Sequence, residues 1–438
     1  MFGSLKKLFG DNTSASPAAK SAQPENKRID APFLRRETVF DRQGKVAGHF
    51  FHIELSSLLA NAEIHRQCAF DRILLDTLNA SPDAWNTTTA FIPISAASLD
   101  QPGLDRLKTA NLVLMINLAP EITDIAALAE RLDQLRERGF SYGLFRQPQH
   151  PAFPILIQHA AYAGVDIEST DPNTVRDFSA AIRSIAPKAP RLLACRVTTE
   201  DDHRFCHQWH FRNFQGNFAT AEGSAPRKLG SDPNKAQLLN LMRLIQGDAE
   251  TKDIAQAMKL DPLLSFRILR YLNSAAIGLT RKVESLEKAV VILGRQRVSR
   301  WVAVMLFSVR EPQIGDWLLI ENALTRGRLM EVLGVQLARP LANDPLFLTG
   351  ILSCLEKLLH RPLAEILADI PVAEEIREAL LKRQGPFAEL LAVVEACEGK
   401  DADLLKARAQ QLGLDPEQVN RALLAATAWA SEVTEYWD

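Results

Sequence analysis

Residues 261–301 read DPLLSFRILRYLNSAAIGLTRKVESLEKAVVILGRQRVSRW, and their pattern predicts two amphipathic helices joined by a turn. Asp261 can cap the free amides of a first helical turn, and Pro262 suits the first helical position because no amide donor is needed there. Apolar side chains then recur on one helical face, at Leu264, Ile268 and Leu272. We expect this face to be buried in a core.

A second helix is predicted to begin after Ser285 and to end at Gly294. Ser285 offers an N-cap, and Gly294 stands where a left-handed C-cap is favoured. Between them, apolar side chains fall at positions i, i+3, i+4 and i+7, which are Leu286, Ala289, Val290 and Leu293. The spacing indicates a second buried face, with Val290 and Leu293 in the core.

The stretch resembles the centre of an HDOD domain. The matching elements are Asp261-Pro262, Asn273-Ser274 followed by Gly278, Val283-Glu284-Ser285, and Leu293-Gly294. A catalytic HD hydrolase would carry a metal-binding His-Asp pair further on, where this chain reads GILSCLE at residues 350–356. No adjacent His-Asp dipeptide occurs in the sequence. The resemblance therefore implies an all-α regulatory domain rather than a hydrolase.

The remainder of the C-terminal half extends this resemblance. Residues 323–331 (ALTRGRLME), 348–356 (LTGILSCLE) and 380–385 (LLKRQG) resemble segments of proteins that combine an EAL with an HDOD domain, and Glu331 is the counterpart of a retained glutamate. Strand patterns are absent after Asn234, and helices are expected around residues 318–337, 345–359 and 374–382. Packing of ordinary helices would give the same pattern.

Composition limits the class of protein. A chain of 438 residues with a formal net charge of −2 is long enough for two or three domains, and it has no overall charge that would attract nucleic acid or an anionic membrane. Its five cysteines are scattered and form no Cys-x-x-Cys motif, which favours a reduced cytoplasmic compartment. Apolar runs fall short of the ~20 residues that span a bilayer, so no transmembrane helix is expected.

Four regions are predicted along the chain. Residues 1–32 form a flexible tail, whose tip MFGSLKKLF (residues 1–9) would either dock on a membrane surface or a partner, or fray. Residues 33–222 alternate strand-like runs with helical ones, which is typical of an α/β domain. Residues 223–233 are rich in Gly, Pro and Ser and indicate a junction, and residues 234–438 form the helical domain. Strands are expected at 90–94, 112–116, 141–145 and 191–197, and helices at 125–138 and 155–163.

The α/β region resembles an EAL domain, the fold that hydrolyses cyclic di-GMP in bacteria. The resemblance is strongest at its two edges, RETVFD at residues 36–41 and FQGNF at residues 214–218. It implies a (β/α) barrel, which would be short here, since such barrels usually take ~250 residues.

The resemblance also implies where the catalytic residues of an EAL enzyme would lie. Its Glu-x-Leu-x-Arg signature aligns with FFHIE at residues 50–54, so Phe50 replaces a metal-binding glutamate and Glu54 a phosphate-binding arginine. The next two metal-binding positions fall at Pro93 and Met115. Phe145 and Arg146 replace a pair of aspartates in the resemblance, and Thr198 replaces a glutamate. Asp166 and Glu168 align with the lysine and the aspartate of a Lys-Ile-Asp segment. Gln215 is the one residue of the expected site that is retained.

These residues cannot assemble a phosphodiesterase site. Metal-assisted hydrolysis needs cations that lower the pKa of a water molecule, and hard cations need oxygen ligands that converge on one place. Phe, Pro, Met and Thr at the aligned positions do not provide them. We therefore expect no catalytic residue, no metal and no cofactor.

Two smaller groups were considered as sites. One face of a helix would carry His203, Cys206, His207 and His210. The first and last of these residues would lie ~10 Å apart along the helix axis, which is too far for one tetrahedral zinc ion. A packed or solvated helix face is therefore expected rather than a zinc site. Arg297, Arg300 and Trp301 form a candidate protein-interaction patch, provided that Trp301 is exposed and does not fill the core. Nucleic-acid binding is not expected from so few aromatic residues.

Two functions remain. The first is a non-catalytic signalling adaptor that contacts protein partners, as the resemblance to regulatory HDOD proteins implies. The second is a cyclic di-GMP receptor without hydrolytic activity. Glu54 and Asp166 disfavour a ligand with two phosphates, and Arg146 is the cation expected in the right neighbourhood.

Overall fold

The structure is a computed structural model, and it describes residues 33–54, 64–85, 87–118, 120, 122–185, 188–216, 218, 233–247, 249–260, 265, 283, 285–307, 314–339, 341–399 and 401–435. The N-terminal tip, the predicted junction up to residue 232, and the first helix of the quoted stretch, with Leu264, Ile268 and Leu272, lie outside the described residues.

The N-terminal part is a closed barrel of eight strands in sequence order. Its strands are β1 Phe33–Asp41, β2 Val46–Glu54, β3 Thr89–Ser95, β4 Leu112–Asn117, β5 Ser141–Phe145, β6 Tyr162–Asp166, β7 Arg191–Cys195 and β8 Asn213–Gln215. The strands from β2 to β8 run parallel, whereas β1 is antiparallel to both β2 and β8. The predicted barrel is confirmed, together with the strands expected in residues 90–94, 112–116 and 141–145 and at the start of 191–197.

A tight hairpin joins β1 to β2. Asp41 Oδ1 accepts hydrogen bonds from the amides of Gln43 and Lys45 at 2.9 Å each, and Gly44 supplies the positive φ of 79° that the turn needs. Val39 then pairs with Gln215 and closes the barrel. One face of β1 and β2 therefore remains available for contact with another part of the chain.

In the described residues, the helices that accompany the barrel strands are α2 Ile64–Asn79, α3 Ile125–Glu137, α4 Phe153–Leu156, α5 Pro172–Arg183 and α6 Glu200–Gln208. The helix expected at residues 155–163 is wrong in its second half. A single 3₁₀ turn, Ile157–His159, follows α4, and Tyr162 already belongs to β6. A buried parallel strand is apolar on both faces, so a short apolar run does not distinguish it from a buried helix.

The C-terminal part is entirely helical in the described residues. Its elements are α7 Pro233–Gln246, α8 Thr251–Lys259, α10 Leu286–Leu306, α11 Ile314–Gly334, α12 Asn343–Leu352, α13 Leu355–Leu359, α14 Leu363–Asp369, α15 Glu374–Arg377, the π-helix η7 Glu378–Lys382, α16 Pro386–Glu398, α17 Ala402–Gln411 and α18 Pro416–Glu435. The three helices expected from the sequence are confirmed, although two of them divide into shorter pieces.

The second helix of the quoted stretch begins as predicted. Ser285 accepts a hydrogen bond from the amide of Lys288 at 3.2 Å, and Val290 and Leu293 are buried. Gly294 has the expected positive φ of 77°, but its ψ of 158° is extended rather than left-handed helical. The chain therefore kinks at Gly294 and continues as a helix to Leu306 instead of ending there.

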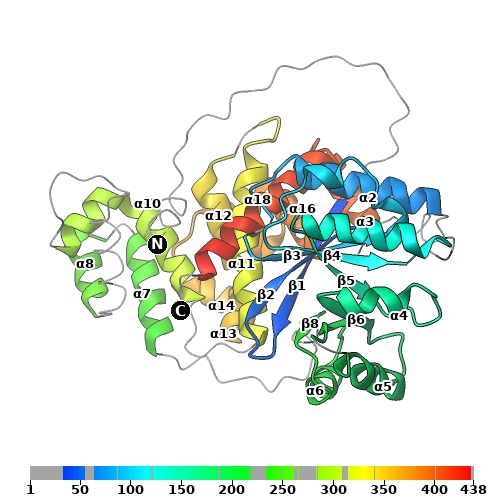
Figure 1. The fold of residues 1–438 in the computed structure, drawn as a ribbon. Helices are drawn as coiled ribbons and strands as arrows, with labels where there is room; N and C mark the ends of the chain where they lie inside the picture. Colours follow the sequence, from blue (N-terminus) through cyan, green and yellow to red (C-terminus); the bar gives the residue numbers. More distant parts are fainter. Residues whose placement is uncertain are drawn as a thin grey trace.

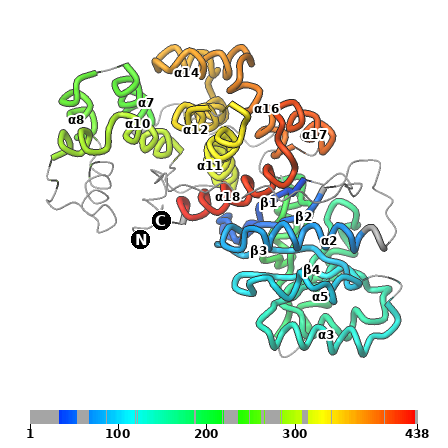
Figure 2. Tube along the Cα trace, turned by 90° about the horizontal axis from the view of Figure 1, so that it is seen from above, coloured from blue at the N-terminus to red at the C-terminus, as the bar shows by residue number. Residues whose placement is uncertain are grey.

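The two parts pack directly against each other. Figure 1 shows α11 and α18 beside the first strands of the barrel, while α7 and α8 lie at the opposite end of the molecule. In the perpendicular view, α18 runs along β1 and β2 (Figure 2), and both α16 and α18 contact β1. Among the described residues, no helix has both the length and the apolar character needed to cross a membrane.

Candidate functional site

The inside of the barrel is filled with apolar side chains. Phe50 stacks on Phe91 with ring centroids 5.4 Å apart, and Phe91 meets the edge of Tyr162 at 5.1 Å. Met115 is fully buried beside them, and Phe145 packs against this cluster from the strand ends. Three of the predicted EAL positions, Phe50, Met115 and Phe145, therefore form packing contacts and provide no oxygen ligand.

Glycine lets these side chains come together. A Cβ atom at Gly143 would lie 2.6 Å from the sulfur of Met115 and 2.7 Å from the Cβ of Tyr162. Pro93 pairs with Met115 on the neighbouring strand, which brings these two predicted positions to the same level of the barrel. The barrel interior is thus closely packed around Met115 and Tyr162.

An ion pair lies at the ends of β6 and β7. Arg196 Nε donates to Asp166 Oδ1 at 2.9 Å, and the guanidinium lies 3.5 Å from Glu168. Arg196 has a positive φ of 54°, and Ser169 adds a hydrogen bond to Asp166 at 2.6 Å. Asp166 and Glu168 are therefore engaged with an arginine that the sequence analysis did not select.

Arg146, the replacement cation that the sequence suggested, follows directly after β5. Its side chain lines a groove of about 720 Å³ between α4 and α5, together with Phe153 and Asp177. Arg196, which follows β7, is a second arginine at the strand ends, and it pairs with Asp166. An isolated arginine after a strand gives no signal of which way its side chain points, so the sequence alone did not distinguish the two.

Gln215 connects the strand ends to β1. Its side-chain oxygen accepts a hydrogen bond from the amide of Arg196 at 2.8 Å, and its side-chain nitrogen donates to Glu37. Thr198 is exposed, and Glu54 ends β2 with a side chain outside the described residues. No three His, Cys, Asp or Glu side chains in the described part of the chain are placed to share a metal ion.

The histidine row is partly packed: Cys206 is buried and His203 and His207 are half-buried, whereas His210 is exposed. The ring of His203 lies between Phe214 and Phe218, with centroids at 4.5 and 4.7 Å. Burial and the neighbouring charge of His207 lower the pKa of His203 to about 4, so it is neutral at neutral pH. His210 lies beyond the end of α6, because that helix ends at Gln208.

The candidate patch at Arg297, Arg300 and Trp301 is not a surface group. Arg297 is exposed, but only 6% of Arg300 and 3% of Trp301 are accessible. Arg300 donates to Glu331 at 3.0 Å, and its guanidinium lies 3.9 Å from the ring centroid of Phe347. The second half of α10 runs through the core after the kink at Gly294, so Arg300 and Trp301 point inward while Arg297 stays exposed.

A buried charged residue with three polar partners lies between the two parts of the chain. Glu321 of α11 is 2% exposed and accepts hydrogen bonds from Thr38 of β1, at 2.8 Å, and from His49 of β2. Arg36 Nη1 completes the group at 3.1 Å from Glu321. A helix of the C-terminal part is thus joined to the outer face of the barrel hairpin by buried polar contacts.

The electrostatics of this group favour the charged form of Glu321. Burial alone would raise the pKa of the carboxyl, but His49 and Arg36, with the hydrogen bonds from His49 and Thr38, lower it to about 2. Sequence reasoning missed this group. Glu321 and His49 are 272 positions apart in the chain, and no local pattern indicates such a pair.

Further polar contacts extend the interface along β1. Arg35 donates to the carbonyls of Ala396 and Cys397 at 2.8 and 3.0 Å, and the amide of Leu34 donates to Asn420 Oδ1 at 2.8 Å. Every residue from Leu34 to Arg36, and Thr38, is therefore bonded to a C-terminal helix. The interface is built from satisfied hydrogen bonds as well as apolar packing.

Comparison with known proteins identifies the first part of the helical half. Residues 233–370 match the HDOD domain. This match confirms the HDOD prediction, and we call residues 233–370 the HDOD region. It includes Glu321, while α16, α17 and α18 follow it in the chain.

Two curated proteins are similar over most of the chain. The uncharacterized protein YuxH of Bacillus subtilis (strain 168) is 25% identical over 332 residues, which covers 74% of this chain and 79% of YuxH. The cyclic di-GMP phosphodiesterase CdgJ of Vibrio cholerae serotype O1 is 23% identical over 309 residues, or 70% of each chain.

Solved structures of EAL proteins are similar to the N-terminal region. The PaMucR phosphodiesterase in complex with c-di-GMP has a TM-score of 0.37 and 15% identity, and covers 42% of this chain and 94% of its own. The EAL domain of Xanthomonas citri FimX, also in complex with c-di-GMP, has a TM-score of 0.33 and 16% identity, over 42% and 85% of the two chains.

Proposed function

We propose that this protein is a non-catalytic signalling protein of a cyclic di-GMP pathway, in which the barrel and the HDOD region act as one unit that binds other proteins. The observation that carries the proposal is the filled barrel. Phe50, Phe91, Met115 and Tyr162 occupy the space in which a metal-dependent hydrolase would need water and oxygen ligands.

The similarity to CdgJ supports the pathway but not the activity. CdgJ is named as a cyclic di-GMP phosphodiesterase, and 70% of each chain takes part in the match. In this protein, the carboxylates at the strand ends are engaged: Asp166 and Glu168 with Arg196, and Glu37 with Gln215. A shared pathway with a lost reaction fits both observations, and we place the protein in the cytoplasm, where five unpaired cysteines would persist.

The second function, a cyclic di-GMP receptor without hydrolysis, is less favoured by the charges. A ligand with two phosphates needs cations that are not already neutralised. Arg196 is neutralised by Asp166 and Glu168, and Arg146 lines a groove outside the barrel. The receptor function is therefore kept as an outcome of the test.

The test measures reaction and binding on the full-length protein. We expect no hydrolysis of cyclic di-GMP with magnesium or manganese, under conditions in which CdgJ turns it over, and no heat of binding in a calorimetric titration. Metal-dependent hydrolysis above the buffer control would overturn the proposal. Binding at low micromolar concentration without hydrolysis would favour the receptor. Affinity purification with the full-length chain as bait should recover a protein partner, and failure to recover any would count against the adaptor.

A further inference from the structure

A cavity lies at the border between the barrel hairpin and the C-terminal helices. Its volume is about 410 Å³, within the usual range for sites that bind small molecules. Strands β1 and β2 form one side, and α11, α13, α16 and α18 form the other. Its lining includes Arg36 and Thr38 of β1, Asn322 and Thr325 of α11, and Lys357 of α13.

The charges of the lining are unbalanced toward the positive. Arg35, Arg36, Arg326 and Lys357 face two carboxylates, Glu37 and Glu398. His52 adds no charge at neutral pH, because burial and the nearby Arg35 lower its pKa to about 4. An anion is therefore the ligand that the lining favours.

Three of these four cationic side chains already bind other groups of the protein. An anionic ligand would therefore bind at the remaining one. Arg326 donates to Glu398 at 2.9 and 2.7 Å, Arg36 is bound to Glu321, and Arg35 is bound to two carbonyls. Lys357 is exposed and makes no ion pair with the described residues. It is the cation that is available to a ligand.

The remaining lining supplies donors and an apolar wall. Asn322 uses its side-chain oxygen to accept from Arg36 at 3.3 Å, which leaves its amide nitrogen to donate. Thr325 accepts from the same guanidinium at 3.4 Å and has a hydroxyl proton to offer. Leu318, Leu329, Val394 and Leu423 form the apolar part. A ligand with an anionic group and a partly apolar body would therefore meet hydrogen-bond donors with the first and apolar side chains with the second.

We propose that the cavity binds a small organic anion, with a carboxylate or phosphate group held by Lys357 and Asn322 and a partly apolar body against the leucines. The site goes beyond the proposed adaptor function and does not depend on it. Because β1 and β2 form one wall of the cavity and α11 forms part of the other, a ligand that fills the cavity contacts the barrel and the HDOD region at once. Occupancy therefore stabilises the docked arrangement of the two parts.

The experiment is a thermal unfolding assay on the full-length protein at constant ionic strength. The probes are AMP for a phosphate, 4-hydroxybenzoate for a carboxylate, and inorganic phosphate for the anionic group alone, each at millimolar concentration. We expect AMP or 4-hydroxybenzoate to raise the unfolding midpoint by about 2 °C or more, and inorganic phosphate to raise it less. The organic probe that gives the larger shift identifies the anionic group.

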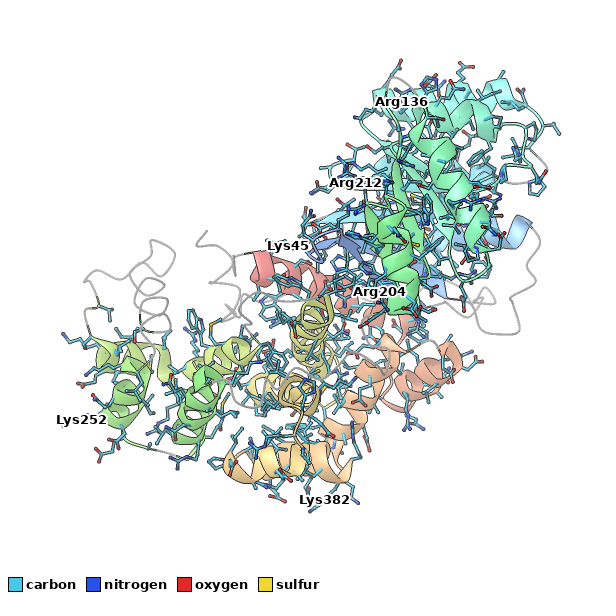
Figure 3. The ribbon with its side chains drawn as sticks, turned by 90° about the horizontal axis from the view of Figure 1, so that it is seen from below. Lys45, Arg136, Arg204, Arg212, Lys252 and Lys382 are labelled. Carbon is cyan, nitrogen blue, oxygen red and sulfur yellow. The ribbon has the colours of Figure 1, made fainter. Side chains whose placement is uncertain are left out.

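A pair of matched variants assigns the effect to the cavity. Lys357→Gln removes the available cation and should abolish the shift, whereas Lys252→Gln removes an exposed lysine of α8, at the end of the molecule away from the barrel (Figure 3), and should keep it. Both lysines are exposed, so circular dichroism should show that both variants remain folded. The proposal is overturned if neither organic anion shifts the parent protein, or if Lys357→Gln keeps the full shift.

Discussion

Thr38 Oγ1 donates a hydrogen bond of 2.8 Å to Glu321 Oε2, and this bond links the first strand of the barrel to a buried carboxylate of the HDOD region. The same carboxylate accepts from His49 and pairs with Arg36, so three residues of one hairpin converge on one glutamate. A buried carboxylate is costly unless it is paired and hydrogen-bonded. Glu321 satisfies this condition only when the two parts are docked.

Glu321→Gln should destabilise the protein. The substitution leaves Arg36 without its carboxylate in a buried setting, and breaking a buried ion pair by removing one partner costs on the order of 3 to 5 kcal/mol. Urea unfolding of the full-length chain measures the loss. Glu287→Gln, on the exposed side of α10, is the control and should change the free energy of unfolding by less than about 0.5 kcal/mol. Equal stability of the two variants would show that the interface group contributes nothing.

Acid should weaken the interface in a defined window. The pKa of Glu321 is about 2 in the folded chain and ordinarily 4.5, so the unfolded chain binds the proton first as the pH falls. The stabilising contribution is complete above pH 4.5 and is lost between pH 4.5 and pH 2. Unfolding measured at a series of pH values should therefore show a smaller loss of stability in Glu321→Gln than in the parent. Parallel curves would contradict the assigned role of this carboxyl.

Arg300 and Arg297 should behave differently although they are three positions apart. Arg300→Ala leaves Glu331 buried without one of its cations and removes the contact with Phe347, so we expect a loss of about 3 kcal/mol or more. Arg297 is exposed, and Arg297→Ala should cost less than about 0.5 kcal/mol. Denaturant unfolding of the two variants side by side checks the buried position of the second half of α10.

Phe50→Glu should not restore hydrolysis and should destabilise the barrel. Phe50 is 6% exposed and stacks on Phe91, so a glutamate there would be a buried charge in an apolar cluster. The other oxygen ligands would still be missing. The expected result is a lower unfolding midpoint and no turnover with magnesium or manganese. Phe50→Leu serves as the control, because it keeps an apolar side chain and should be less destabilising.

Leu293→Ala should cost about 2 to 5 kcal/mol, the usual range for a buried leucine. Leu293 is 6% exposed and lies one residue before the kink of α10. Val291, which is 69% exposed on the same helix, provides the comparison, since Val291→Ala should change stability little. Similar losses at both positions would mean that the buried face of this helix is assigned wrongly.

The fold was predictable where the signal is local. Caps and apolar spacing indicated the helix at Ser285, and apolar runs indicated the strands of the barrel. Prediction failed in the second half of residues 155–163, because a buried strand and a buried helix share the same apolar composition over a short run. It also failed at Gly294, where a positive φ marks a kink as well as a helix end.

The candidate sites were less predictable because their partners are distant in sequence. The sequence suggests that Arg300 is a surface arginine, because its buried partners Glu331 and Phe347 are 31 and 47 positions away in the chain. His49 and Thr38 carry no pattern that indicates Glu321. The lack of oxygen ligands at Phe50 and Met115 is visible in the sequence. The pair of Arg196 with Asp166 is not, since it requires the strand order of the closed barrel.

The position of β1 bears on how modular this protein is. The same strand closes the barrel against β8 and carries the residues that hold Glu321, Asn420 and the carbonyl of Ala396. A fragment cut between the barrel and the helices would expose these polar groups and their apolar neighbours together. The barrel and the helical part therefore cannot be exchanged independently for the corresponding parts of another protein. A chimera would have to replace the β1–β2 hairpin together with the helices that bind it.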